Sequence, residues 1–142
     1  MSEPTLPDGF EPAQFTSGFL DHGGPYFFKP RTAAPLLMGL RICTHHINYK
    51  DTAHGGAIST FADVALSHAV YDAERPRLAP STIALQVNYL RAARLNEWLE
   101  ADVQIDRIGG RTAYTSGRIL CVGADGAEPV ATMTGVFAIR RS

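Results

Sequence analysis

The hydrophobic pattern of this chain changes its period once, near residue 80. Over residues 55–74, apolar side chains recur every three or four positions, which predicts one long amphipathic helix. The apolar stripe of this helix consists of Ile58, Phe61, Ala62, Ala65, Leu66, Ala69 and Val70. From residue 80 onward, apolar and polar residues alternate instead, which is typical of half-buried strands. Such a chain has to bury one helix against one sheet.

Four strands are expected after the helix, with short links between them. The expected spans are residues 80–89, 99–106, about 111–122 and 130–140. In the first of them, the apolar positions are Ile83, Leu85, Val87 and Tyr89. Gly109-Gly110 and Ala124-Asp125-Gly126 predict turns, and the short links predict an antiparallel meander. With two more strands expected over residues 25–29 and 36–45, the pattern predicts an α+β fold, an antiparallel sheet around one long helix.

Length and composition indicate one domain without an obvious macromolecular target. The 142 residues suit a single core. Residues 1–24 are expected to form an N-terminal arm with one short helix, and residues 25–142 the domain. A net charge of −1 gives no general attraction to nucleic acid or anionic membranes, and no apolar run approaches the roughly 20 residues that span a bilayer.

The N-terminus and the cysteines indicate in which cellular compartment the protein is expected. The first ten residues lack the basic-then-apolar pattern of a signal peptide. Cys43 and Cys121 lie far apart in apolar surroundings, which favours two buried, reduced thiols over a disulfide or a metal site. Together these features predict a cytoplasmic protein.

The start of the long helix carries the residue types that acyl transfer needs. The first turn of a helix has N–H groups without intrahelical partners, and these groups carry partial positive charge. Gly55 and Gly56 have no side chains that would block a ligand, so the N–H groups can stabilise an oxyanion. Asn48 and His54 can add side-chain donors beside them. Asp63 lies at the edge of the apolar stripe, where a carboxylate in a cleft can act as a general base.

Each of these features has a simpler explanation when it is taken alone. A Gly-Gly pair before a helix often forms only a tight turn, and an aspartate on the flank of a helix is usually solvated. His22-Gly23-Gly24 repeats the tripeptide in the arm, with no amphipathic helix after it. Asp63 and Gly55 are also about 12 Å apart along the helix. If both act on one carbonyl carbon, a symmetric dimer with antiparallel helices must bring them together from different subunits.

The combination is more specific than its parts. Asn48, His54-Gly55-Gly56 and Asp63 within AISTFADVALSHA, with the segment over residues 82–120, resemble the PaaI-like acyl-CoA thioesterases of the hotdog-fold superfamily. The resemblance covers about residues 36–140. It implies a hotdog domain that hydrolyses acyl-CoA-type thioesters without a cofactor. It also implies a homodimer or a dimer of dimers, with the sites at the subunit interface. One departure is Ala92, where the family frequently has proline.

The resemblance also implies a role for each residue of the site. Asp63 would be the general base for water or the direct nucleophile. The N–H of Gly55 or Gly56 would polarise the thioester carbonyl from the partner chain. Asn48 and His54 match positions that orient the carbonyl or the water.

The residues that contact the water, the CoA phosphates and the acyl group are predicted less directly. Thr82 lies where relatives often carry a hydroxyl that helps to hold the water. The phosphates of CoA call for cations, and the candidates are Arg91, Arg94, Arg107 and Arg111; a solvated basic rim explains them equally well. Candidates for an acyl pocket are Phe19, Tyr26, Phe27, Phe28, Leu66, Val70 and Tyr71, which ordinary core packing explains as well.

Two other functions stay open, and no metal site is expected. One is a hydratase or dehydratase acting on enoyl or β-hydroxyacyl thioesters; His54 would serve there, although the Asp-to-His spacing of that branch is absent. The other is a non-catalytic dimer that binds an acyl ligand. His45, His46, His54 and His68 show no metal-ligand spacing. In a strand, moreover, His45 and His46 would point to opposite faces.

Overall fold

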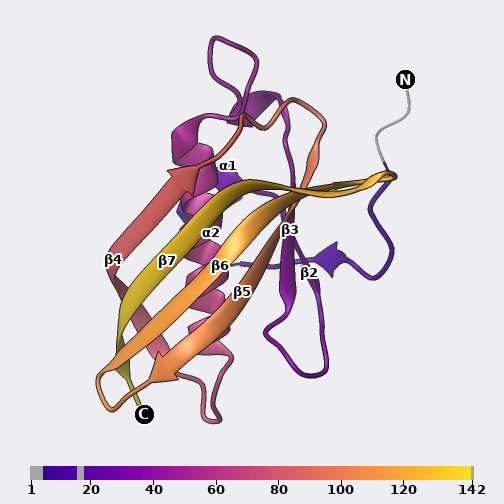
Figure 1. The fold of residues 1–142 in the computed structure, drawn as a ribbon. Coiled ribbons are helices and arrows are strands. Elements are labelled where there is room, and N and C mark those ends of the chain that lie inside the picture. Colours follow the sequence, from indigo (N-terminus) through magenta and orange to yellow (C-terminus); the bar gives the residue numbers. More distant parts are fainter. Residues whose placement is uncertain (1–4, 16–17, 142) are drawn as a thin grey trace.

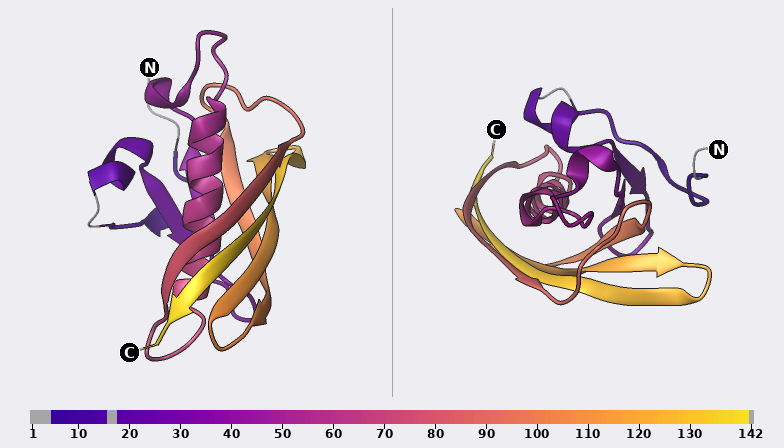
Figure 2. Two further views of the ribbon diagram at one scale, coloured as in Figure 1. Left: turned by 90° about the vertical axis from the view of Figure 1, so that its left-hand side faces the viewer. Right: turned by 90° about the horizontal axis from the view of Figure 1, so that it is seen from above.

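The computed structural model describes residues 5–15 and 18–141. One long helix, α2 (Gly55–Tyr71), lies within the curve of a seven-stranded sheet (Figures 1 and 2). The strands are β1 (Glu11–Pro12), β2 (Tyr26–Lys29), β3 (Leu37–Arg41), β4 (Ala79–Tyr89), β5 (Trp98–Ile108), β6 (Thr112–Gly123) and β7 (Gly126–Arg140). The predicted α+β fold, with the sheet wrapped around one helix, is confirmed. None of the helices in the described ranges is both long and apolar enough to cross a membrane.

The order of the strands differs from the predicted meander. The sheet runs β1-β2-β3-β5-β6-β7-β4, with every neighbouring pair antiparallel. β5, β6 and β7 form a meander, but β4 lies at the edge beside β7, and β5 pairs with β3. The link over residues 90–97 is longer than a tight hairpin loop, so the chain can pass from one edge of the sheet to its middle.

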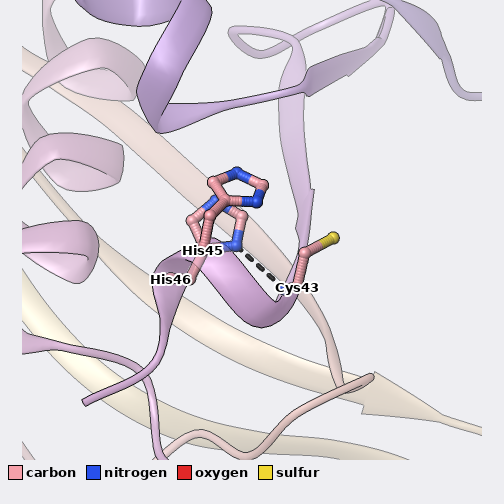
Figure 3. Close-up of side chains that lie close together, drawn as sticks. All are labelled: Cys43, His45 and His46. Carbon is pink, nitrogen blue, oxygen red and sulfur yellow. Dashed lines mark hydrogen bonds between the residues drawn. The ribbon is translucent and has the colours of Figure 1, made fainter.

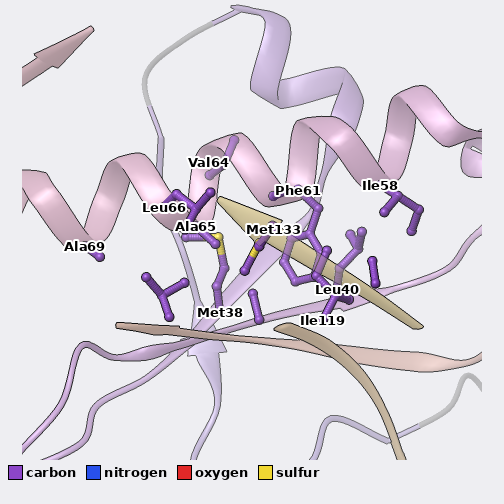
Figure 4. Packing of buried hydrophobic residues seen from close by; sticks show 14 of the residues in the cluster. Met38, Leu40, Ile58, Phe61, Val64, Ala65, Leu66, Ala69, Ile119 and Met133 are labelled. Carbon is purple, nitrogen blue, oxygen red and sulfur yellow. The ribbon is translucent and has the colours of Figure 1, made fainter. Parts of the chain in front are cut away.

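The core lies between α2 and the concave face of the sheet (Figure 4). All seven residues of the predicted apolar stripe are buried. They pack against side chains from β3, β6 and β7, which include Met38, Leu40, Ile119 and Met133. Since full burial of one such side chain contributes about 2 kcal/mol, this contact holds the helix in place. The helix ends at Tyr71 instead of continuing to residue 74.

The N-terminal segment packs onto the same sheet. β1 pairs with β2, and the ring of Phe10 lies edge-on to Trp98, with centroids 5.0 Å apart. The short helix expected in the arm is α1 (Gly18–Gly23). Part of the expected arm, residues 1–4 and 16–17, lies outside the described residues.

Candidate active site

Helix α2 begins at the predicted tripeptide. His54 is its N-cap, and Nδ1 of the ring accepts a hydrogen bond from the Gly56 N–H at 2.8 Å. Because Nδ1 is the acceptor, the neutral ring carries its proton on Nε2. The Gly56 N–H, one of the two predicted oxyanion donors, is therefore occupied by the cap. The Gly55 N–H is left as the backbone donor for a ligand.

Tyr89, at the end of β4, fixes the first turn of α2. Its hydroxyl donates to the Gly55 carbonyl at 2.8 Å, so the Ser59 hydroxyl donates in turn to the Tyr89 oxygen. A Cβ at Gly55 would lie 3.6 Å from the Tyr89 oxygen, an ordinary contact. From its sequence pattern, Tyr89 was expected only to lie on the apolar face of a strand. Its contact with the helix depends on the curvature of the sheet, which the alternation of residues does not reveal.

Asp63 meets Thr82 across the gap between α2 and β4. The Thr82 hydroxyl donates to Oδ1 of Asp63 at 2.7 Å, and Asp63 is half-buried. No group in the described part of the chain donates to Oδ2. The contact brings together two predicted site residues that lie 19 positions apart in the sequence.

A β-bulge makes this contact possible. Thr82 and Ala84 pair with successive residues of β7, so Ile83 is an extra residue in the strand. Leu85 packs toward the core, and in a regular strand Thr82 would then face the opposite side. The extra residue shifts the alternation by one and turns Thr82 toward Asp63. Ile83, predicted to lie on the apolar face, is 58% exposed. β-Bulges are over-represented next to active sites.

Asn48 organises the loop that leads into the helix. Its Oδ1 accepts hydrogen bonds from the Lys50 N–H at 2.9 Å, the Thr52 N–H at 3.3 Å and the Thr52 hydroxyl at 3.2 Å. The oxygen of the carboxamide is thus used within the loop. Only the Nδ2 group of Asn48 is left to donate to a ligand.

Arg91, one of the predicted CoA-binding cations, is held in ion pairs. Its guanidinium donates two hydrogen bonds to Glu97, at 2.9 and 3.2 Å, and lies 3.3 Å from Glu128. The hydrogen bonds with Glu97 raise the pKa of Arg91 and lower the pKa of Glu97 to about 2. These contacts hold the link between β4 and β5 and occupy the Arg91 side chain.

The other predicted cations lie at opposite ends of the sheet. Arg94 is exposed and forms a backbone bridge with Thr52, close to the start of α2. Arg107 and Arg111 are exposed at the hairpin between β5 and β6, near the other end of α2 (Figure 1). The structure therefore does not bring the four arginines into one cluster.

A groove of about 590 Å³ adjoins Asp63. Its other walls are Gln14, Phe15, Leu20, Phe28, Val64, Ser67, His68, Tyr71 and Pro80. Among the predicted acyl-pocket residues, Phe28 and Tyr71 line this groove. The remaining candidates are in the core (Tyr26, Leu66 and Val70), packed on Trp98 (Phe27) or exposed (Phe19). The groove is large enough for a small-molecule group and is mostly apolar, as such sites usually are.

The segment after β3 differs from the predicted strand over residues 36–45. β3 ends at Arg41, and a short 3₁₀ helix, η1 (Thr44–His46), follows. The rings of His45 and His46 are 3.9 Å apart instead of pointing to opposite faces (Figure 3). Together with Cys43 they bring three potential metal-ligand atoms within 4.8 Å of one another. Cys43 and Cys121, predicted to be buried, are half-buried, and neither forms a disulfide.

Backbone hydrogen bonds already engage most of these histidine nitrogens. Nδ1 of His46 accepts from the Cys43 N–H at 2.9 Å (Figure 3). Its Nε2 donates to the Gly23 carbonyl at 2.7 Å. Nε2 of His45 donates to the Gly24 carbonyl at 2.6 Å. Burial also lowers the pKa of His46, which favours the neutral ring. The cluster thus ties the arm to η1, and a metal would have to displace these bonds.

Comparisons with known proteins agree on one family. The model of the thioesterase superfamily matches residues 50–124. A Pseudomonas aeruginosa protein that bears the name "Putative esterase" is 36% identical over 132 residues, which make up 93% of this chain and 96% of that protein.

Solved structures share the fold. A hypothetical thioesterase protein with coenzyme A from Streptococcus pneumoniae superposes with a TM-score of 0.72 over 82% of this chain and 88% of that one, at 22% identity. The Escherichia coli PaaI protein from the phenylacetic acid degradation operon gives 0.67 over 75% and 73%, at 20% identity. At such identities these structures show the fold alone, which is the hotdog fold.

Proposed function

This chain belongs to the thioesterase superfamily, and on that basis we propose that it hydrolyses acyl-CoA-type thioesters to a free acid and the CoA thiol. The observation that carries the proposal is the hydrogen bond from Thr82 to Asp63 on the wall of the groove. It fixes one carboxylate oxygen of Asp63 and leaves the other without a hydrogen-bond partner among the described residues, on the wall of a groove of about 590 Å³. The Streptococcus pneumoniae thioesterase was solved with coenzyme A, which supports the choice of thiol.

The chemistry requires one base and one oxyanion donor. Oδ2 of Asp63 takes a proton from water while the water oxygen bonds to the thioester carbon. The Gly55 N–H stabilises the negative oxygen that forms. The carbon–sulfur bond then breaks, and the thiolate leaves and receives the proton. Direct attack by Asp63 is the alternative, through an acyl-enzyme that water hydrolyses.

A second subunit completes this arrangement. Asp63 and Gly55 are about 12 Å apart along α2, so the base and the donor of one site come from two chains. The exposed edge of β4 supports self-association. Within the described ranges this strand pairs only with β7, and Ile83, Tyr89 and the following Leu90 are 58%, 51% and 55% exposed. An apolar, unpaired edge of this kind favours pairing with another chain. We therefore propose a homodimer, which can associate further into a dimer of dimers.

A thiol-release assay tests the reaction. We expect free thiol from acyl-CoA substrates, measured with a thiol reagent, and no added metal or cofactor is needed. Hydration of an enoyl-CoA without thiol release would favour the hydratase alternative. Binding of an acyl-CoA, measured by calorimetry, without any turnover would favour the ligand-binding alternative.

A mixing experiment tests the composite site. Asp63→Asn and Gly55→Ala homodimers should each lose activity, because every site lacks one partner. In a mixed dimer both changes fall in one site, and the other site is intact. Random mixing of the two chains should therefore restore about a quarter of the wild-type sites. Mixed samples that stay inactive, while mass spectrometry shows mixed dimers, would contradict a shared site.

A further inference from the structure

Two cavities meet at a single histidine of α2. The groove beside Asp63 and a second cavity of about 600 Å³ share two lining residues, Phe28 and His68. The second cavity lies between the C-terminal half of α2 and the segment over residues 30–36, which joins β2 to β3. Among the described residues, no other side chain lines both spaces. Phe28 and His68 therefore form the partition between them.

The partition is closed in this structure. The ring centroids of Phe28 and His68 are 4.6 Å apart. Phe15 and Tyr71 flank the imidazole, with centroids 6.5 and 5.6 Å away. A methylene chain needs about 3.5–4.0 Å between its carbons and those of each neighbouring ring. It therefore cannot pass between Phe28 and His68 as they lie.

Hydrogen bonding does not account for the position of His68. Its Nδ1 is buried and has no hydrogen-bond partner in the part of the chain that the structure describes. Burial lowers the pKa of His68, so the ring is neutral near pH 7. A ring without a formal charge, packed against Phe28, can close the end of an acyl groove.

We propose that His68, closed against Phe28, sets the length of the acyl group that the site accepts. This assignment rests on the thioester hydrolysis proposed above. With its carbonyl at Asp63, an acyl group extends along the groove, and its far end meets His68. The two residues are five positions apart on α2, about 7.5 Å along the helix axis. Short acyl groups fit this space, and longer ones need the cavity beyond the partition.

The test is a chain-length profile of thiol release with butanoyl-, octanoyl- and dodecanoyl-CoA. In His68→Ala, the two cavities join, and the ratio of kcat/KM for dodecanoyl-CoA to that for butanoyl-CoA should rise at least about tenfold. Each methylene that becomes buried is worth roughly a factor of four. His68→Phe keeps a ring against Phe28 and should retain the wild-type ratio. His22→Ala, which removes an exposed histidine of α1, is the matched control.

A second variant guards against effects of misfolding. Phe28→Ala opens the same partition from β2 and should shift the profile in the same direction. The assignment is overturned if folded variants at both positions keep the wild-type ratio, or if their rates fall equally for every chain length. If the wild-type protein itself released no thiol from any acyl-CoA, the hydrolase proposal would fail first. The two failures are thus distinguishable.

Discussion

The tripeptide His-Gly-Gly occurs twice in this chain, and the two copies have opposite structural roles. His54-Gly55-Gly56 starts the long helix α2, where the Gly56 N–H bonds to His54 and the Gly55 N–H is left as a backbone donor for a ligand. His22-Gly23-Gly24 ends the short helix α1, and the carbonyls of its glycines accept hydrogen bonds from His46 and His45. One copy offers donors at the start of a helix, and the other offers acceptors at the end of one.

The difference shows that helix polarity, and not the residue types, decides what the motif does. N–H groups at a helix start are electropositive, and carbonyls at a helix end are electronegative. Only the first kind of group can stabilise an oxyanion. A Cβ at Gly55 would make only ordinary contacts with Tyr89, the nearest at 3.6 Å, while a Cβ at Gly23 would lie 2.8 Å from the oxygen of the buried Tyr26. Substitutions at matched positions of the two copies should therefore have different effects.

The largest difference in kcat between the two regions is expected when Asp63, which follows the tripeptide of α2, or Asp21, which precedes the tripeptide of α1, is changed to asparagine. Asp63→Asn keeps the shape of the side chain and can still accept the hydrogen bond from Thr82, but the amide cannot take a proton. We expect kcat for thioester hydrolysis to fall by about 10³-fold, with an unchanged melting temperature. Asp21→Asn, next to His22, is the control and should leave kcat unchanged. Equal rates for the Asp63 variant and the wild-type protein would remove the proposed base.

A methyl group at Gly55, in His54-Gly55-Gly56, should lower activity without loss of stability. In Gly55→Ala, the new Cβ makes only an ordinary contact with Tyr89, 3.6 Å away, and alanine is the better helix former. The methyl group nevertheless lies beside the N–H that we propose as the oxyanion donor. We expect a loss of about 10²-fold in kcat/KM, measured by thiol release. A melting temperature that falls together with the rate would instead indicate a structural role.

The same change at Gly23, in His22-Gly23-Gly24, should lower stability and leave activity unchanged. In Gly23→Ala, the new Cβ would lie 2.8 Å from the Tyr26 oxygen, so the buried ring has to move. We expect a loss of about 2 kcal/mol in the free energy of unfolding, measured by urea denaturation. The rate per folded molecule should be unchanged. A stable but inactive Gly23 variant would contradict the contrast between the two tripeptides.

Mild acid should weaken the contact of His46 with the Gly23 carbonyl in His22-Gly23-Gly24. Burial lowers the pKa of His46 below its ordinary value of about 6.5, so the unfolded chain takes up the proton first. The contribution of His46 to stability is therefore complete above pH 6.5 and decreases as the pH falls below that value. His68, whose pKa is lowered by burial as well, acts in the same direction. We expect the melting temperature to fall by a few degrees between pH 7 and pH 5.

A variant separates the contribution of His46 from the rest. In His46→Gln the side chain no longer titrates, so the decrease in melting temperature between pH 7 and pH 5 should be smaller than in the wild-type protein. An identical decrease in both proteins would show that other groups cause the acid sensitivity.

For the candidate site residues, the sequence predicted local structure where that structure depends on near neighbours. The start of the helix at Gly55 and the place of Asp63 at the edge of its buried face follow from local periodicity, and both agree with the structure. The capping bond from Gly56 to His54 was not predicted, although it is local, because a histidine cap is uncommon. The ion pair of Arg91 with Glu128 was missed because Glu128 lies in β7, far along the chain from the link that carries Arg91.

Several elements of this protein follow from its amino-acid sequence alone: the long amphipathic helix, the alternating strands after it and the two tight hairpins between β5, β6 and β7. These depend on residues within one turn or one hairpin, where side-chain periodicity and turn chemistry act directly. Three further features arise only from tertiary contacts: β4 lies beside β7, an extra residue at Ile83 turns Thr82 toward Asp63, and His46 holds the arm by Gly23. Each of these joins distant segments, and the free energy of packing the whole sheet around α2 selects them.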